Sequence, residues 1–254
     1  HDLVVAVHGR FETSHHPCKG LDGHLDPGAE PSGFGQQHSV DAHGPKASGR
    51  AARPAGSLLA MSAPSVVAVA QGSAAERAGL AVGDVVLSIN GLVPRDVIEW
   101  RFAADEAEVV LEVRRGTGET TIEIAKRAGE PLGAEVSSAV FDRVHTCDNH
   151  CEFCFIYQLP KGMRKSLYTK DDDYRLSFLY GNFTTLTRFT EADLERVIDE
   201  KLSPLYVSIH AAEPKKRAEM LRNERGGTSL RWLGLLLDAG IEVNAQVVLC
   251  PGVN

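Results

Sequence analysis

Three cysteines within eight residues constrain this chain of 254 residues more than any other feature. Cys147, Cys151 and Cys154 have the spacing C-x3-C-x2-C, and only Cys18 and Cys250 lie outside it. An odd number of cysteines without a secretion signal is a poor basis for disulfides, so the spacing favours metal or redox chemistry in a reducing compartment. Three thiolates on one loop can hold three corners of a cubane iron-sulfur cluster, which leaves the fourth iron open to a small molecule.

Zinc is the alternative for the same spacing, because a structural zinc site takes four nitrogen or sulfur ligands. His145 or His150 would supply the fourth ligand. Spacing and ligand type favour an iron-sulfur cluster over zinc, and cysteines without any metal are the least favoured interpretation.

Residues 1–62 differ in composition from the rest of the chain. They hold seven of the ten histidines among Gly, Pro, Ser and Ala, with little hydrophobic periodicity. Such a segment buries too little apolar surface to offset the entropy lost on ordering, which predicts disorder. The chain begins with His, and Met61 directly precedes the first well-patterned segment. One interpretation is that translation starts at Met61 and that the first sixty residues are not native.

Residues 63–128 predict a small β-rich domain with one or two helices, from alternating apolar residues between glycine and asparagine turn signals. The expected strands are 66–70, 85–89, 108–114 and 120–124, and the expected helices are 74–78 and 94–102.

After a linker at 128–133, residues 134–254 predict strands that alternate with helices. Strands are expected at 137–144, 175–180, 205–209 and 241–249. One helix begins at Thr190, with Asp193 in a capping arrangement, and another begins at Thr228 or Ser229 and ends at Gly240. This alternation predicts parallel βα units, in an open sheet or a barrel.

The sequence GSAAERAGL at 72–80, followed by VGDVV at 82–86 and ING at 89–91, resembles the middle of a PDZ domain. The resemblance implies peptide binding by addition of a strand to a sheet edge, with a Gly-rich loop holding the peptide's carboxylate. No such loop precedes Val66 in recognisable form. We therefore favour a PDZ-like module that docks to its own chain over one that captures a free peptide.

The cysteine run has an aromatic residue, Phe153, directly before its last cysteine, and follows the first expected strand of the βα series. With CFIYQLPKGMR at 154–164, DDDYRLSF at 171–178 and GNFTTLT at 181–187, it resembles radical S-adenosylmethionine (SAM) enzymes. The resemblance extends to a bacterial subfamily that joins an N-terminal PDZ-like domain to a radical SAM barrel and a C-terminal domain of unknown function 512. It covers roughly residues 65–254.

The resemblance implies an α/β fold: a partial (βα) radical SAM barrel at 134–254, truncated after about four strands. The PDZ-like domain at 63–128 and the disordered segment at 1–62 precede it. The chain would then be a fragment that lacks the C-terminal part, one that could bind a cluster yet fail to turn over.

The resemblance also implies the cofactors and their ligands. Cys147, Cys151 and Cys154 would bind three irons of a 4Fe-4S cluster, and S-adenosyl-L-methionine would chelate the fourth. Phe153 would lie near the adenine. Such a protein would be an oxidoreductase-like enzyme that reductively cleaves SAM to a 5'-deoxyadenosyl radical, with the cofactor supplying the chemistry.

Three further residues are candidate SAM contacts. Gly181 and Asn182 stand where many family members carry a Gly-Gly-Glu motif, but Asn182 has no charge, so backbone carbonyls around Gly181 would do more of the binding. Ser208, at the end of the third expected strand, would lie at the carboxyl edge of the sheet. His210 is either a contact or a satisfied core residue, and Asn244 and Gln246 are weaker candidates.

Composition limits the partners. A net charge of −7 gives no overall attraction to nucleic acid or anionic lipid, and no apolar run approaches the roughly 20 residues of a membrane helix. We expect a cytoplasmic protein with an unknown small-molecule or macromolecular substrate and an electron donor such as flavodoxin or ferredoxin. The charged loop 161–173 would either fold over the cofactor or be a solvated surface.

Two alternatives remain open. One is a PDZ-type binding module with a zinc-stabilised, cysteine-rich extension. The other is an iron-sulfur electron carrier without radical chemistry.

Overall fold

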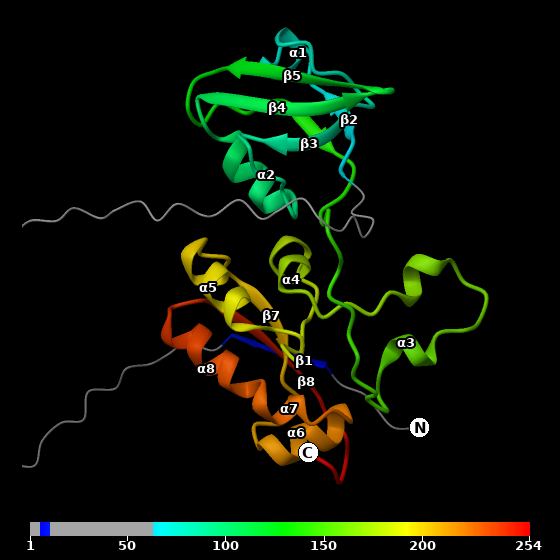
Figure 1. Ribbon diagram of the computed structural model, residues 1–254. Helices are drawn as coiled ribbons and strands as arrows, with labels where there is room; N and C mark the ends of the chain where they lie inside the picture. The colour runs from blue at the N-terminus through cyan, green and yellow to red at the C-terminus, as the bar shows by residue number, and fades with distance from the viewer. Residues whose placement is uncertain (1–5, 11–62) are drawn as a thin grey trace, which may run out of the picture. The chain divides into compact units, whose positions relative to one another are not determined.

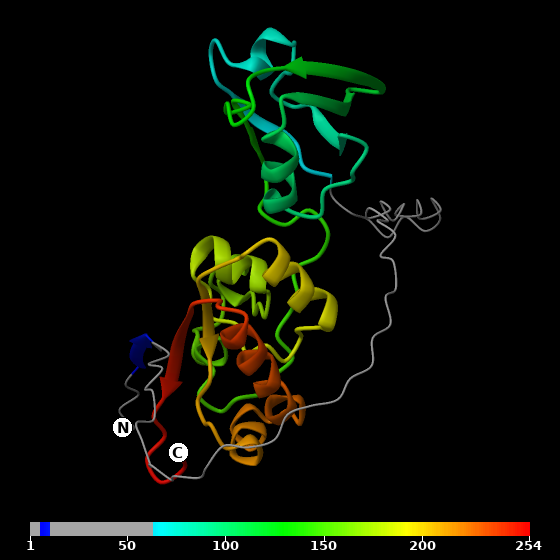
Figure 2. The ribbon, with the colours of Figure 1, turned by 90° about the vertical axis from the view of Figure 1, so that its left-hand side faces the viewer.

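The computed structural model of this protein describes residues 6–10 and 63–254 (Figures 1 and 2). The disorder prediction for residues 1–62 falls outside the described residues except at 6–10. The interpretation of Met61 as the start also falls outside them. Within them, no helix is both long and apolar enough to cross a membrane.

Residues 65–136 form two small antiparallel sheets and two helices. Strands β3 (Val85–Ile89), β4 (Glu108–Arg115) and β5 (Gly118–Ala125) form one sheet, and β2 (Val66–Val69) pairs with β6 (Ala134–Val136) in the other. Helix α1 (Ala74–Arg77) follows β2, and α2 (Val97–Ala104) follows β3.

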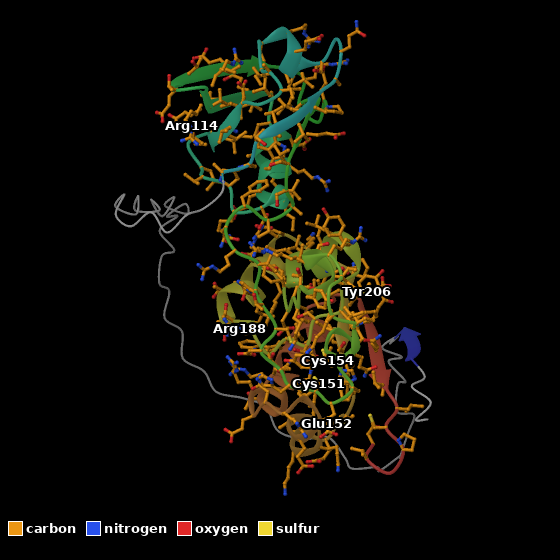
Figure 3. The ribbon with its side chains drawn as sticks, turned by 90° about the vertical axis from the view of Figure 1, so that its right-hand side faces the viewer. Arg114, Cys151, Glu152, Cys154, Arg188 and Tyr206 are labelled. Atoms are coloured by element: carbon orange, nitrogen blue, oxygen red, sulfur yellow. The ribbon has the colours of Figure 1, made fainter. Side chains whose placement is uncertain are left out.

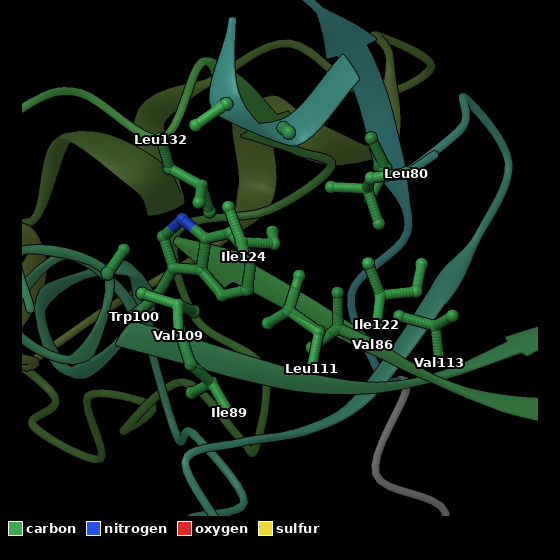
Figure 4. Packing of buried hydrophobic residues seen from close by; sticks show 14 of the residues in the cluster. Leu80, Val86, Ile89, Trp100, Val109, Leu111, Val113, Ile122, Ile124 and Leu132 are labelled. Carbon is green, nitrogen blue, oxygen red and sulfur yellow. The ribbon is translucent and has the colours of Figure 1, made fainter. Parts of the chain in front are cut away.

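Strict alternation on β4 explains how this part of the chain builds its core. Val109, Leu111 and Val113 are buried, whereas the residues between them are exposed, as period-2 geometry requires. They pack with Trp100 of α2 and Ile124 of β5 (Figure 4). The predicted β-rich domain is present, with its strands within one or two residues of the expected positions.

Strand β6 comes from the segment that we assigned to the radical SAM core. Its three residues pair with β2, and the amide of Ser137 donates to the carbonyl of Ser65 at 2.8 Å. The β-rich region therefore closes only at about residue 136.

The remaining residues form an α/β arrangement around strands β7 (Leu205–Ser208) and β8 (Val243–Val248), which are parallel. Backbone residues 6–10 form β1 (Ala6–Arg10), which pairs antiparallel with β8, so the order is β1-β8-β7. Thr184 makes one parallel bridge to Val207 on the other side of β7. Strand β1 lies within the segment for which we expected disorder.

Helices fill the connections. They are α3 (Phe155–Gln158), the 3-10 helix η1 (Lys165–Tyr168), α4 (Tyr174–Tyr180), α5 (Glu191–Asp199), α6 (Pro214–Leu221), α7 (Arg225–Thr228) and α8 (Leu230–Asp238). Both views show α5 and α8 beside β7 and β8 (Figures 1 and 2). Trp232 and Leu236 of α8 pack with Leu205 and Val243 of the strands in a second core.

The prediction of a strand at 175–180 is wrong, because these residues belong to helix α4. Asp173 caps the helix by accepting a hydrogen bond from the amide of Arg175 at 3.0 Å, and Gly181 ends it in the left-handed conformation (φ 74°). These two end signals outweigh the β propensity of the aromatic residues between them.

The prediction of a strand at 137–144 is also wrong. Only Val140 makes a bridge there, to Asp96, and the hydroxyl of Ser138 donates to the carbonyl of Val140 in a local turn. The mixed α/β class is confirmed. Closure into a barrel, and its truncation after about four strands, remain predictions.

Candidate functional site

The three cysteines and the four residues predicted to contact SAM line one cavity of about 500 Å³. The cavity also takes in residues at the carboxyl ends of both parallel strands, where ligand sites in α/β sheets form. The predicted residues are Cys147, Cys151, Phe153, Cys154, Gly181, Asn182 and Ser208, and they are joined by Lys170, Asp171, His210 and Gln246. Figure 3 shows Cys151 and Cys154 together on the cysteine loop.

All three cysteines carry free thiols, and Cys147 and Cys154 act electrostatically on Cys151. Cys151 is buried, whereas Cys147 and Cys154 are half-buried. Burial raises the pKa of the Cys151 thiol to about 11, and the two neighbouring cysteines add to the rise. Burial also raises the pKa of Cys147. A cationic group bound beside these thiols would favour their thiolate forms, as metal binding does.

The donor set fits an iron-sulfur cluster bound by three thiolates, because the thiols share one cavity that has room for a further ligand. Among the residues described, no group of three or more His, Cys, Asp and Glu side chains is arranged to hold a single metal ion.

The cysteine loop is held by hydrogen bonds at its start and in its middle. The amide of Cys147 donates to the carbonyl of Lys170 at 2.8 Å, and the amide of His150 donates to the carbonyl of Leu221 at 3.0 Å. Between them, the buried Asn149 donates to the hydroxyl of Thr185 at 2.8 Å. The side-chain Oδ1 of Asn149 accepts from the side-chain amide of Asn223 at 2.7 Å. The loop is therefore held by contacts with Lys170, with the end of α6, with the connection between α6 and α7, and with Thr185.

Asp172 fixes the neighbouring wall and was not singled out by the sequence. Its carboxylate is buried and accepts hydrogen bonds from the hydroxyls of Thr184 (2.7 Å) and Thr187 (2.8 Å) and from the amide of Arg188 (3.1 Å). The sequence features that could have pointed to Asp172 are the acidic run at 171–173 and the threonine-rich segment at 184–187. Such a run is usually a solvated surface, so burial could not be inferred from composition.

Asn182 has a carboxylate beside it. Its amide nitrogen donates to Asp171 Oδ2 at 3.0 Å, and both residues line the cavity. The carboxyl group of Asp171 therefore lies beside Asn182 on the cavity wall.

His210 is both a cavity residue and a satisfied core residue. It is buried, its ring contacts Phe153 edge-on at 4.7 Å between centroids, and its Nδ1 accepts from the amide of Val248 at 3.2 Å. Burial, together with the nearby Arg217 guanidinium, lowers the pKa of His210 to about 4. The ring is therefore neutral at pH 7, with its proton on Nε2.

Ser208 and Gln246 join the ends of the two parallel strands. The hydroxyl of Ser208, the last residue of β7, donates to Gln246 Oε1 of β8 at 3.1 Å. This pair presents polar groups on the cavity wall between the two strands.

Comparison with known families agrees with this geometry. The family model for a radical SAM-like domain matches residues 126–254, slightly more than half of the chain. The chain belongs to the radical SAM-like family. The match spans the cysteine loop, the cavity and both parallel strands. A search of curated proteins found no match.

A second family model, for a PDZ domain, matches residues 65–115 of this radical SAM-like protein. The two-domain description is therefore confirmed. Membership of the subfamily with the domain of unknown function 512 remains a prediction.

The PDZ domain has a cavity of about 620 Å³ lined by α2, β2 and the loop before β6. Trp100 and Ala104 of α2 face it with Leu132 and Gly133 of the loop. A side chain at Gly133 would come within 2.2 Å of Ser73, and its φ of 81° also favours glycine. This Gly-containing loop follows β5.

Proposed function

We propose that this chain is a radical SAM enzyme, or a part of one, that binds a 4Fe-4S cluster through Cys147, Cys151 and Cys154. When bound, the cluster would supply the electron that cleaves SAM to methionine and a 5'-deoxyadenosyl radical, which acts on a substrate still to be identified. One observation carries the proposal: the three cysteines and the predicted SAM contacts line one cavity in the radical SAM-like domain.

The chain's own residues would bind and orient SAM. Asp171, hydrogen-bonded to Asn182, supplies a carboxylate for the SAM ammonium group, and the carbonyls around Gly181 accept from the same group. Phe153 offers an apolar face for the adenine. Ser208 and Gln246 offer a hydroxyl and an amide for the ribose.

The proposal includes a setting. Free thiols and a reduced cluster both require a reducing compartment, so we propose a bacterial cytoplasmic location. An external one-electron donor and a substrate of unknown class would complete the reaction.

Electron paramagnetic resonance tests the cluster. We would reconstitute the chain with iron and sulfide without oxygen, reduce it, and record spectra with and without SAM. A reduced 4Fe-4S signal that changes when SAM is added is expected. In the variant Asp171→Asn, the SAM concentration needed for the spectral change should rise at least tenfold. The signal recorded without SAM should be unchanged.

A cysteine outside the cavity provides the matched control. Cys151→Ser should abolish the signal, whereas Cys250→Ser, which does not line this cavity, should keep it. Tight binding of one zinc ion with no cluster would overturn the proposal in favour of the zinc-stabilised binding module. A cluster that does not respond to SAM would favour the electron carrier.

A second candidate function is peptide binding by the PDZ domain, favoured by the cavity between α2 and the loop before β6. Within the described residues β6 pairs only with β2, so its other edge can accept a strand. A peptide library with free C-termini tests this. Arg101→Glu, at an exposed residue of α2 that lines the cavity, should weaken binding at least tenfold. Equal binding by peptides with amidated C-termini would contradict carboxylate recognition.

A further inference from the structure

Residues 155–170, which we call the basic arm, have a charge opposite to that of the whole chain. They contain four cations, Lys161, Arg164, Lys165 and Lys170, and no aspartate or glutamate, whereas the chain carries −7. The arm begins directly after the third cysteine, because Cys154 is the N-cap of α3. In Figure 1 the segment with α3 loops out from the helices and strands that follow it.

Both ends of the basic arm are attached to the cysteine loop. At the far end, Lys170 accepts the amide of Cys147 through its carbonyl, and its Nζ donates to the carbonyl of Asn149 at 2.7 Å. The same Nζ donates to the hydroxyl of Tyr157 at 2.8 Å, which joins the two ends of the arm. A molecule bound on the arm would therefore lie beside the cysteines.

The middle of the arm is held by its own contacts. The hydroxyl of Tyr168 donates to the carbonyl of Pro160 and accepts the amide of Met163 at 3.0 Å. These bonds close the turn that carries Lys161 and Arg164. The arm therefore has a defined conformation that presents these cations together.

The surface combines apolar and positive groups. Phe155 is 71% exposed, Tyr157 56% and Met163 42%. Lys161, Arg164 and Lys165 are exposed too, and none of the three forms an ion pair with the residues that the structure describes. Aromatic, Met and Arg side chains are the types enriched at protein interfaces, and unpaired cations steer acidic partners.

We propose that the basic arm is the docking surface for an acidic one-electron carrier protein. The inference rests on the proposed function, which needs one electron from outside. A surface with three unpaired cations suits the small, charge-guided interfaces of electron-transfer encounters. Its attachment to Cys154 and Cys147 favours a redox partner over a nucleic acid, because a carrier must come close to the metal centre.

The electron balance is simple for a flavoprotein donor. A flavin hydroquinone would lose one electron and become a semiquinone, and the oxidised cluster would gain that electron. No bond is formed or broken between the two proteins.

Binding of oxidised flavodoxin, an acidic carrier, tests the surface without any turnover. Titration calorimetry at low ionic strength would compare the parent with the variant K161Q/R164Q/K165Q. We expect binding at least tenfold weaker in the variant, and a steep loss of parent binding when salt is raised. The matched control R114Q/K201Q/K215Q removes the same charge from exposed positions elsewhere and should change binding less than twofold.

Cluster reduction gives the second measurement. In stopped-flow mixing, flavodoxin hydroquinone should reduce the K161Q/R164Q/K165Q cluster at least tenfold more slowly at low salt, whereas dithionite should reduce parent and variant alike. Equal flavodoxin rates or affinities for parent and variant would overturn the inference. So would an arm that binds single-stranded RNA but not flavodoxin.

The two proposals fail in different ways. If no cluster assembles, the proposed function fails, and flavodoxin binding to the metal-free chain still measures the arm. If the cluster assembles and responds to SAM but flavodoxin ignores the arm, only the docking inference fails.

Discussion

His210 is a polar residue that carries no charge at pH 7. Its backbone is left-handed (φ 63°), its Nδ1 is used by the amide of Val248, and its pKa is lowered to about 4. The sequence could identify it as a cavity candidate, because it follows a predicted strand end. It could not decide its protonation, which depends on burial and on Arg217, a residue of α6, a helix that the sequence reading did not predict.

A pH dependence of stability follows from His210. Its pKa is about 4 when folded and 6.5 as a free side chain, so the fold favours the neutral ring. The stability that this contributes is full above pH 6.5 and is lost as pH falls toward 4. Between pH 7 and pH 5 the parent should therefore lose about 2 kcal/mol more free energy of unfolding than His210→Asn.

Urea unfolding at the two pH values measures this difference. Asn tolerates the left-handed backbone and offers an oxygen to the amide of Val248. An equal loss in parent and variant would mean that His210 titrates normally in the folded protein.

At the scale of elements, the residues that cap the ends of a helix are the most reliable guide from sequence to structure. Helix α5 was predicted from Thr190 and Asp193, and the structure has the full capping box: Thr190 accepts the amide of Asp193 and Asp193 accepts the amide of Thr190. The same kind of signal at Asp173 and Gly181 was overlooked because aromatic residues suggested a strand. Both helices therefore carry their end signals in the sequence, and at α4 these signals outweigh the β propensity of the residues between them.

Removing the cap of α5 should cost about 1 kcal/mol of unfolding free energy. The change is Thr190→Ala, and thermal or urea unfolding measures it. Thr228→Ala is the matched control, because the hydroxyl of Thr228 only donates to the carbonyl of Arg225 and caps no amide. A loss of equal size in both variants would show that the box contributes nothing specific.

At the scale of the whole chain, one buried carboxylate joins residues a hundred positions apart. Asp96 is the N-cap of α2, accepting from the amides of Ile98 and Glu99, and also accepts from Arg196 of α5 at 2.7 and 3.0 Å. Arg175 lies 3.5 Å away from the same carboxylate. An ion pair between residues so far apart leaves no local pattern in the sequence. The sequence could therefore predict the two domains but not the ion pair between Asp96 and Arg196.

Asp96→Asn should reduce the free energy of unfolding by about 3 to 5 kcal/mol at pH 7, because two buried arginines lose a charge partner. Burial raises the pKa of Asp96, but the bonds from Arg196 and from the Glu99 amide outweigh it and lower the pKa below 3.8. Its contribution is therefore full above pH 4 and is lost as pH falls through the folded pKa.

The gap between parent and Asp96→Asn should accordingly narrow when unfolding is measured at successively lower pH below 4. Asp105→Asn, an exposed acid at the other end of α2, is the control and should show a change under 0.5 kcal/mol. A constant gap down to pH 2 would mean that the carboxylate charge does not matter.

The attachment of both ends of the basic arm to the cysteine loop also bears on how the protein would be degraded. Trypsin cleaves after lysine and arginine, and only in segments that can open locally. The arm offers Lys161, Arg164 and Lys165. Its opening requires release of two bonds of Lys170: its carbonyl accepts from the amide of Cys147, and its Nζ donates to the carbonyl of Asn149. A metal that fixes the cysteine loop would slow that opening, so molecules without the metal would be cut first in the arm.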